Sequence, residues 1–412
     1  MTDPVSRPKP LSQDEVLEAV RAELRDTLGG DEGTISDQRR RALRYYHGKP
    51  FGNEVDGRSR VILTDVAEVI EWMMPGLMRT FAGGRQICRY LPVTSDDVDM
   101  AKQATAYAHY TFTRHNNGFL LFYQWFKDAL REKNGFIRYG WETAETRYSR
   151  RFSGLETAEL SAIVEQYDAE VVEKVERTEL RESGAQDPAT GAALTQEVKV
   201  FDARVAWTTK QSCFKVYNVP PEEFLISKRA TLDIDAARCV AWRRSITRGQ
   251  LVALGYDEDS VATLPTDDSL EYEAERIERY EEEDSGKTGS SASRMSPDWA
   301  SQTVYFAEVY LRLDQDGDGI RELRRICVGG GRDAFEILKR DGKPDNEEVS
   351  EIPFATVTPI PEPHRFHGKA EAELTMDLQL IRSTVLRNIL DNFYQVNNNR
   401  YAAVEGEVEI SD

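Results

Sequence analysis

The 412 residues suffice for two to four domains at about 100–200 residues each, and 40% hydrophobic with 30% charged residues is an ordinary composition for a folded protein. The formal charge of −19 argues against tight nucleic-acid binding, which needs lysine and arginine to neutralise phosphates. The favoured interpretation is that this acidity mainly serves solubility, and a surface past which DNA slides without sticking is the alternative. The polar residues 1–13 lack the apolar core of a signal peptide, and no apolar stretch is long enough to cross a bilayer, so we expect a cytoplasmic protein with no membrane partner.

The first third of the chain predicts amphipathic helices, because its apolar residues recur at spacings of three or four. Such helices are expected over residues 14–28, 36–46, 60–81, 96–115 and 119–133. Pro75 should kink the third of them, since proline removes a backbone donor inside a helix. A strand is expected over 87–93, between the third helix and the fourth.

From Gly135 onward the pattern favours strands. Residues 136–148 alternate as a half-buried strand does, and a short helix is expected over 153–169. Two Val-rich runs with alternating charge, 170–180 and 197–205, predict a long hairpin whose tip lies near 184–191. Further strands are expected over residues 213–227, 239–247, 303–313, 321–328, 335–338 and 353–359.

A strongly acidic segment interrupts this succession of strands. Between Asp257 and Asp284 the chain holds 13 acidic residues against two arginines, and residues 285–297 are rich in Gly and Ser. We interpret 257–300 as an acidic helix followed by a flexible loop, both exposed at the periphery.

No recognisable catalytic or cofactor motif is present in the sequence. It contains no phosphate-binding P-loop, no HExxH, no GxSxG and no GxGxxG after a strand. His364 and His367 form an HxxH that could hold a metal if carboxylates converged, but a rigid proline-rich turn ahead of a helix is the favoured interpretation. Reduced thiols are favoured over disulfides or a zinc site for the well-separated cysteines, which are Cys88, Cys213, Cys239 and Cys327. We therefore expect no catalytic residue, no cofactor and no metal.

The segment from Asp314 to Glu322 resembles the opening of a calcium loop, with aspartates at alternate positions followed by glycine. An EF-hand needs a bidentate glutamate at the twelfth position, where this chain has Arg325, and it needs flanking helices where this chain has strand-like runs. Gly317 and Gly319 supply the positive φ angles of a tight turn, so a β-hairpin tip is the favoured interpretation. A calcium-stabilised binding module centred on Asp314–Glu322 is the alternative.

The last predicted helix, about 371–396, has a broad apolar face. That face is formed by Leu374, Leu378, Ile381, Val385, Ile389 and Phe393. A helix this long with such a face must pack against something large. Because little sequence follows it, we expect either that partner subunits cover this face or that the chain is truncated at its C-terminus.

The C-terminal region resembles portal proteins of tailed phages, of the P22-like short-tailed type. The resemblance is strongest where the block from Thr358 to Lys369 (TPIPEPHRFHGK) leads into 371–382, and it continues through 386–394 and 397–401. The hairpin at 314–323 and the stretch from Arg58 to Trp72 also resemble the corresponding segments of this family.

The resemblance implies a structural virion component and not an enzyme. It implies a homo-oligomeric ring of about a dozen copies at one capsid vertex, which forms the head-tail attachment point. Double-stranded DNA would pass through this ring non-specifically during packaging and ejection. The implied partners are other copies of the chain, the large terminase, capsid and scaffolding proteins, and tail adaptor proteins, in the host cytoplasm during assembly and then in the virion.

The resemblance also implies an α+β fold, in which a portal-type wing of helices and antiparallel strands leads into a long stem helix. Residues 1–365 would be the wing, 371–397 the first stem helix and 398–412 the start of a truncated, clip-like β region. The candidates for transient contact with DNA in the channel are Arg382, Arg387 and Arg400.

Overall fold

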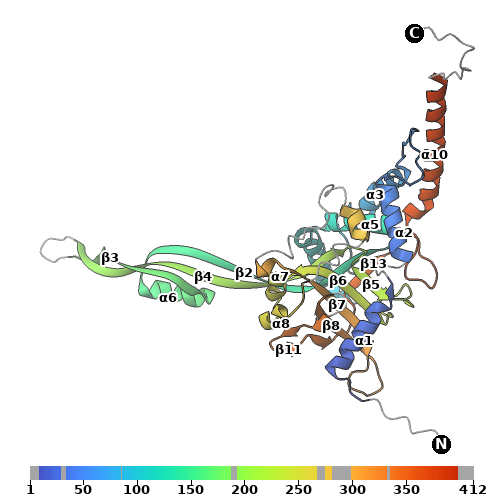
Figure 1. The fold of residues 1–412 in the computed structure, drawn as a ribbon. Helices are drawn as coiled ribbons and strands as arrows, with labels where there is room; N and C mark the ends of the chain where they lie inside the picture. Colours follow the sequence, from blue (N-terminus) through green and yellow to red (C-terminus); the bar gives the residue numbers. More distant parts are fainter. Residues whose placement is uncertain are drawn as a thin grey trace, which may run out of the picture. The chain divides into compact units, whose positions relative to one another are not determined.

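The computed structural model describes residues 9–28, 34–84, 86–186, 193–266, 274–280, 298–331 and 335–397. The chain forms two compact units, a main unit of Met1–Tyr139 with Val216–Asp412 and a second unit of Gly140–Lys215. Figure 1 shows helices together with antiparallel sheets, which confirms the predicted α+β class. No helix in the described ranges is both long and apolar enough to cross a membrane.

The helices of the first third form largely as predicted. They are α1 (Gln13–Arg25), α2 (Thr34–Tyr46), α3 (Asp65–Phe81), α4 (Val98–Tyr110) and α5 (Gly118–Glu132), with a 3-10 turn at Ser95–Asp97 and a π-helical turn at Thr111–His115. Ser12 and Glu15 form a capping box that fixes the start of α1. Helix α3 begins at Asp65 and not at Arg60, and it continues through Pro75 to Phe81.

The strand predicted over 87–93 does not form. Pro92 removes one backbone donor from this segment, and the backbone N–H of Tyr90 donates to the Thr105 hydroxyl at 3.0 Å. The Thr105 side chain of α4 therefore accepts a hydrogen bond that a neighbouring strand would otherwise accept.

The main unit is built on an antiparallel sheet in the order β1, β5, β6, β7, β8, β12, with β9 also paired to β8. These strands are β1 (Thr27–Leu28), β5 (Phe224–Ser227), β6 (Cys239–Thr247), β7 (Thr303–Leu313), β8 (Glu322–Gly330), β9 (Phe335–Ile337) and β12 (Asn346–Glu348). Val309 and Leu311 of β7 pack with Val16 and Val20 of α1, whereas Tyr310 belongs to a second cluster of buried residues. Both faces of β7 are thus buried, which agrees with its nearly continuous apolar sequence.

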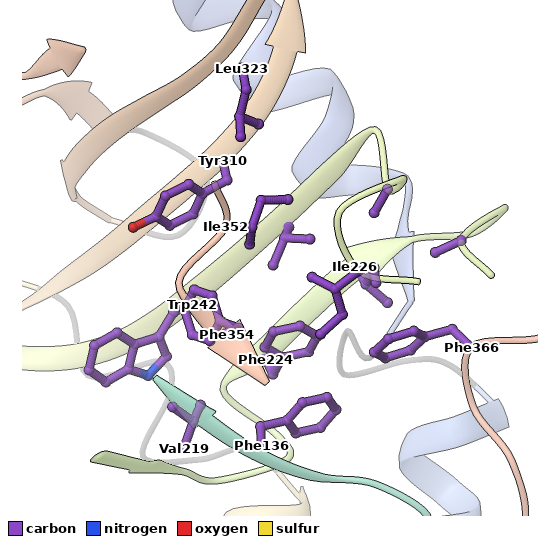
Figure 2. Close-up of a cluster of buried hydrophobic side chains, with 14 residues drawn as sticks. Phe136, Val219, Phe224, Ile226, Trp242, Tyr310, Leu323, Ile352, Phe354 and Phe366 are labelled. Carbon is purple, nitrogen blue, oxygen red and sulfur yellow. The ribbon is translucent and has the colours of Figure 1, made fainter. Parts of the chain in front are cut away.

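The second cluster is dominated by aromatic rings (Figure 2). The rings of Phe136 and Phe224 stack with centroids 4.0 Å apart, and that of Phe366 lies 6.1 and 6.0 Å from them. Phe366 lies in the proline-rich turn, so its burial ties this turn to the sheet. The short strand β13 (Phe354–Val357) adds Phe354 to the cluster and pairs with the start of β2 (Gly135–Leu155).

The second unit contains the predicted long hairpin. Strands β3 (Glu170–Gln186) and β4 (Ala193–Val219) pair antiparallel from Glu170 opposite Ala206 to Gln186 opposite Ala193. Most of the predicted tip, residues 187–191, lies outside the described residues. Helix α6 (Thr157–Tyr167) forms within the predicted helical stretch, and its Leu160 packs on Phe201 and Val205 of β4.

The acidic segment differs from the prediction of one exposed helix. Helix α7 (Arg248–Ala253) precedes it, and within it form α8 (Glu258–Ala262) and α9 (Ala274–Tyr280). Residues 263–266 are not helical, because Leu264 is buried against the sheet and Pro265 follows it. Residues 267–273 and 281–297, which include the predicted loop, lie outside the described residues.

The remaining elements lie near the C-terminus, apart from one 3-10 turn at Trp299–Ser301. Strands β10 (Lys339–Arg340) and β11 (Lys343–Pro344) form a small hairpin. Helix α10 (Glu371–Asn397) confirms the long helix predicted near the C-terminus, with the predicted bounds. Ala372 and Met376 in its first turns pack into the core formed by α2, α3 and α5.

Candidate functional site

Helix α10 buries a polar stripe against its own chain. Every fourth residue along one face is polar, namely Gln379, Ser383, Arg387 and Asp391. Gln379 and Ser383 are fully buried and Arg387 is 6% exposed. Residues four apart lie on one side of a helix, so this stripe runs along the helix axis.

The partner of the stripe is the segment 51–66, called the strap below, which is irregular up to Thr64 and ends in the first residues of α3. The side-chain carbonyl of Gln379 accepts a hydrogen bond from Val66 N at 2.8 Å, and the Ser383 hydroxyl accepts one from Leu63 N at 3.1 Å. Asp391 accepts one from Ser59 N at 2.7 Å. The strap therefore runs antiparallel to α10, and its backbone donors are satisfied by helix side chains instead of a sheet.

Arg387 makes the densest set of contacts in the stripe. Its guanidinium donates to the Val61 carbonyl, the Asn53 side chain and the Glu54 carboxylate, each at 2.8 Å. Burial opposes the ionisation of Glu54, but backbone N–H groups, among them those of Phe51 and Gly52, together with Arg387 outweigh it and lower the pKa of Glu54. The arginine and the glutamate thus form a charged pair inside the structure.

The three arginines proposed as DNA contacts have different surroundings. Arg387 is engaged within its own chain, an arrangement that favours an anchoring role. Arg382 is 62% exposed in its side chain and pairs with Asp65 at the start of α3. Arg400 lies outside the described residues. Of the two that the structure describes, Arg382 is the one open to solvent.

The opposite face of α10 is apolar and exposed. The six predicted apolar residues lie on this face and are 44–62% exposed, namely Leu374, Leu378, Ile381, Val385, Ile389 and Phe393. Val396, near the end of the helix, is 70% exposed. A surface helix ordinarily buries its apolar face and exposes its polar one. Helix α10 does the reverse within the described chain, and exposed apolar surface of this extent marks an interaction site.

Comparison of the chain with known protein families identifies the family to which it belongs. The family model described as Phage SU10 portal protein matches residues 16–412. The chain belongs to this phage portal protein family. The match confirms the resemblance to tailed-phage portal proteins, which are structural components of the virion that form homo-oligomeric rings and interact with capsid and terminase. The family is structural and is not known for an enzymatic activity.

A second polar cluster of this portal protein is buried between α5, α9 and the loop before β5. Arg279 of α9 lies at its centre, with Nη2 at 2.6 Å from Glu132 and 2.8 Å from Glu222, and Nη1 at 3.3 Å from Asp128. Glu132, Glu222 and Glu275 have carboxylate oxygens within 4.8 Å of one another, a grouping that could hold a metal ion. The Arg279 guanidinium supplies positive charge at this point.

Helix α9 adds a buried carboxylate to the same cluster. Glu275 is 2% exposed, and its nearest cation is Arg39 of α2, at 3.7 Å. Burial raises the pKa of Glu275 to about 7 against the opposing effect of Arg39, and burial likewise raises the pKa of Asp128 to about 6. Helix α9 is therefore an internal ion-pair element, whereas Glu258 and Asp259 of α8 are exposed, which corrects the prediction of one solvent-exposed acidic helix.

The Asp314–Glu322 motif forms the predicted hairpin tip between β7 and β8. Gly317 and Gly319 have φ angles of +79° and +95°. The Asp314 carboxylate accepts hydrogen bonds from the backbone N–H groups of these two glycines, at 2.7 and 2.9 Å. The carboxylates of the motif also converge to within 4.8 Å, in the set Asp314, Asp316, Asp318 and Glu322.

The two histidines of the HxxH lie in a turn ahead of α10, as predicted. The turn is closed by Lys369 N, which donates to the Ile360 carbonyl at 2.9 Å. His367 is buried, whereas His364 is exposed. Neither belongs to the metal-like carboxylate clusters found among the described residues.

We expect Arg387→Ala to destabilise the protein by about 3–5 kcal/mol, because the substitution leaves the Glu54 carboxylate buried without its cation. Arg382→Ala on the same helix should cost less stability than Arg387→Ala, since the Arg382 side chain is 62% exposed and that of Arg387 is 7% exposed. Thermal unfolding and hydrogen exchange of residues 51–66 measure both effects. Equal stability losses in the two variants would contradict the anchoring role of Arg387.

The raised pKa of Glu275 predicts a pH-dependent contribution to stability. A carboxyl whose pKa is higher in the folded state binds its proton more tightly there, so its contribution to stability falls as pH rises from about 4.5 to about 7. Glu275→Gln removes this loss of up to about 3 kcal/mol. The melting temperature of the variant relative to the wild type should therefore rise between about pH 5 and about pH 8.

The matched control for this prediction is Glu258→Gln, at an exposed position of α8. Its melting temperature should follow that of the wild type over the same pH range. A constant difference between Glu275→Gln and the wild type would show that Glu275 does not titrate as expected.

Proposed function

We propose that α10 is the first stem helix of a portal ring and that its apolar face packs on neighbouring copies of the chain. The observation that carries this proposal is the inverted helix, whose polar face is held by the strap while its apolar face is exposed. A head-to-tail contact that closes into a ring would cover this face in every copy. A ring of about a dozen copies is the size that the family resemblance implies.

We propose further that the ring conducts double-stranded DNA during packaging and ejection. The net charge of −19 disfavours tight binding along such a passage, because binding strength follows the number of neutralised phosphates. Among the residues that the structure describes, Arg382 is the candidate for transient contact with DNA phosphates. Arg400 lies outside the described residues and is a candidate on the basis of the sequence alone. Arg387 would act indirectly, since it fixes the position of the helix.

The division of the chain follows the same proposal. Residues 1–365 would form the wing, 371–397 the first stem helix and 398–412 the start of the clip. The large terminase would supply the work of packaging, while capsid and scaffolding proteins and tail adaptors would contact the ring from outside. Assembly would take place in the host cytoplasm.

The proposal is tested by placing a charge on the apolar face. Val385→Asp should abolish ring formation and leave the melting temperature of the monomer unchanged, because the Val385 side chain is 51% exposed in the monomer. Native mass spectrometry and light scattering report the oligomer. Gln103→Asp adds the same charge to an exposed position of α4 and should leave ring formation intact. A folded Val385→Asp variant that forms rings as well as the wild type would contradict the proposed interface.

Calcium binding at the hairpin tip is a second candidate function, favoured by the convergence of carboxylates from Asp314 to Glu322. Its test is the melting temperature with millimolar calcium and with a chelator, in the wild type and in Asp316→Asn. Because the Asp314 carboxylate already accepts two backbone hydrogen bonds within the hairpin, we expect no calcium-dependent shift. A shift present in the wild type and absent from the variant would establish the calcium site.

A further inference from the structure

Helices α3 and α10 lie side by side in the main unit (Figure 1). Ile70 and Met74 of α3 and Ala372 and Met376 of α10 belong to one cluster of buried residues. These four residues mark the inner sides of the two helices. Each helix therefore has an outer side that the other helix does not cover.

The outer side of α3 carries Trp72, which is 78% exposed. Trp72 lies two positions from both Ile70 and Met74, and two residues correspond to about 200° around a helix. Its indole ring therefore points away from the shared core. An exposed tryptophan on a regular helix is the kind of side chain that anchors protein interfaces.

The outer side of α10 carries Leu374 and Leu378, which are 53% and 58% exposed. Leu374 lies two positions from both Ala372 and Met376, so it also points away from the shared core. The two helices thus present a tryptophan on one surface and leucines on the opposite surface. A two-fold axis would bring like surfaces of two copies together, whereas a head-to-tail contact brings the tryptophan of one copy to the leucines of the next.

The heights of these side chains along α10 also agree. The strap runs antiparallel to α10 and leads into α3, and the backbone N–H of Val66 donates to the Gln379 side chain. Each helix rises about 1.5 Å per residue, so Trp72, six residues after Val66, lies at a height about six residues before Gln379. Rotation about a ring axis moves a residue without changing its height along that axis. In the proposed ring, with α10 along the axis, Trp72 therefore meets the neighbouring copy at the level of Leu374.

Charged residues beside the two surfaces are complementary. Glu68 lies one turn before Trp72 on the outer side of α3, and its carboxylate has no ion-pair partner among the residues that the structure describes. Arg41 of α2 borders the leucine surface, because its guanidinium lies 3.8 Å from Asp377, the residue before Leu378. The Arg41 side chain is 57% exposed and this ion pair is long, so a second carboxylate can reach it. By the same count of residues, Glu68 lies at the height of Asp377.

We propose that the Trp72 side of α3 in one copy packs on Leu374 and Leu378 of the neighbouring copy, with Glu68 facing Arg41 of that neighbour. The proposal rests on the portal ring proposed above and names the surface that the apolar face of α10 meets there. It accounts for the first turns of that face. The tryptophan supplies the apolar contact area, and the ion pair fixes the direction in which successive copies follow one another.

Trp72→Ala in the full chain tests this contact. Because the side chain is exposed in the monomer, the melting temperature of the monomer should not change. The concentration needed for ring formation should rise about tenfold or more, as the loss of an interface tryptophan predicts. Light scattering over a dilution series and native mass spectrometry measure the effect. The matched control is Trp141→Ala, which removes a tryptophan that is 66% exposed in the second unit and should leave ring formation unchanged.

A disulfide between copies tests the pairing of the two surfaces directly. Trp72→Cys combined with Leu374→Cys, in a chain whose exposed Cys88 is replaced by serine, should give a ladder of covalently linked chains on oxidation. The two new cysteines lie on opposite sides of one chain and cannot reach each other within it, so only neighbouring copies can be linked. Trp72→Cys alone and Leu374→Cys alone should give no ladder.

The outcomes separate this contact from the ring itself. Ring formation by Trp72→Ala at the wild-type concentration would overturn the contact and leave the ring standing, and so would rings of the double-cysteine variant that give no ladder. A wild-type chain that stays monomeric at every concentration, or a folded Val385→Asp variant that forms rings, would instead overturn the ring interface on which the contact rests.

Discussion

The contact between Arg387 and the strap is the interaction on which the rest of the portal protein's C-terminal architecture depends. A buried guanidinium that donates to Val61, Asn53 and Glu54 allows only one rotation of α10 about its axis. Gln379, Ser383 and Asp391 then fall into place along the same line. Because this rotation turns the polar side inward, the apolar side has to face outward. The apolar side faces outward because the polar side chains of α10 must be buried where they find hydrogen-bond partners. It does not face outward for lack of an apolar core to pack against.

The same use of buried charge recurs elsewhere in the main unit. Arg279 connects α9 to α5 and to the loop before β5 through carboxylates, where an ordinary helix would use apolar contacts. Buried ion pairs add little net stability, because the loss of hydration offsets most of the attraction between the charges. Each buried charge can, however, be satisfied by only a few partners, which makes the docking position specific. In both places a short or otherwise weakly held segment is positioned by an arginine. The apolar clusters hold the sheet together, and the arginines determine where peripheral elements dock.

Local periodicity was enough to predict the helices α1–α5 and α10 and the hairpins β3–β4 and β7–β8, since each repeats its pattern over several turns or residue pairs. The polar stripe could not be predicted in this way. Gln379, Ser383 and Arg387 look like solvent-facing residues until the strap, more than 300 positions earlier in the sequence, is placed beside them. Glu275 looked exposed for the same reason, because its partner Arg39 lies in the distant helix α2 and is brought beside it only by the fold. The strand expected at 87–93 failed because a Thr105 side chain supplied the hydrogen bond that a neighbouring strand would have made.

The antiparallel course of the strap along α10 has a mechanical consequence. A force along the helix axis loads the contacts at Gln379, Ser383, Arg387 and Asp391 together, in shear, so none can break before the others are strained. A force that pulls the helix sideways loads them one after another, beginning at Asp391. A slip of one residue along the axis would also turn the helix by about 100° and remove every contact at once. Helix α10 is therefore stiff against axial thrust and compliant against peeling, and axial load on it passes directly through the strap into α3.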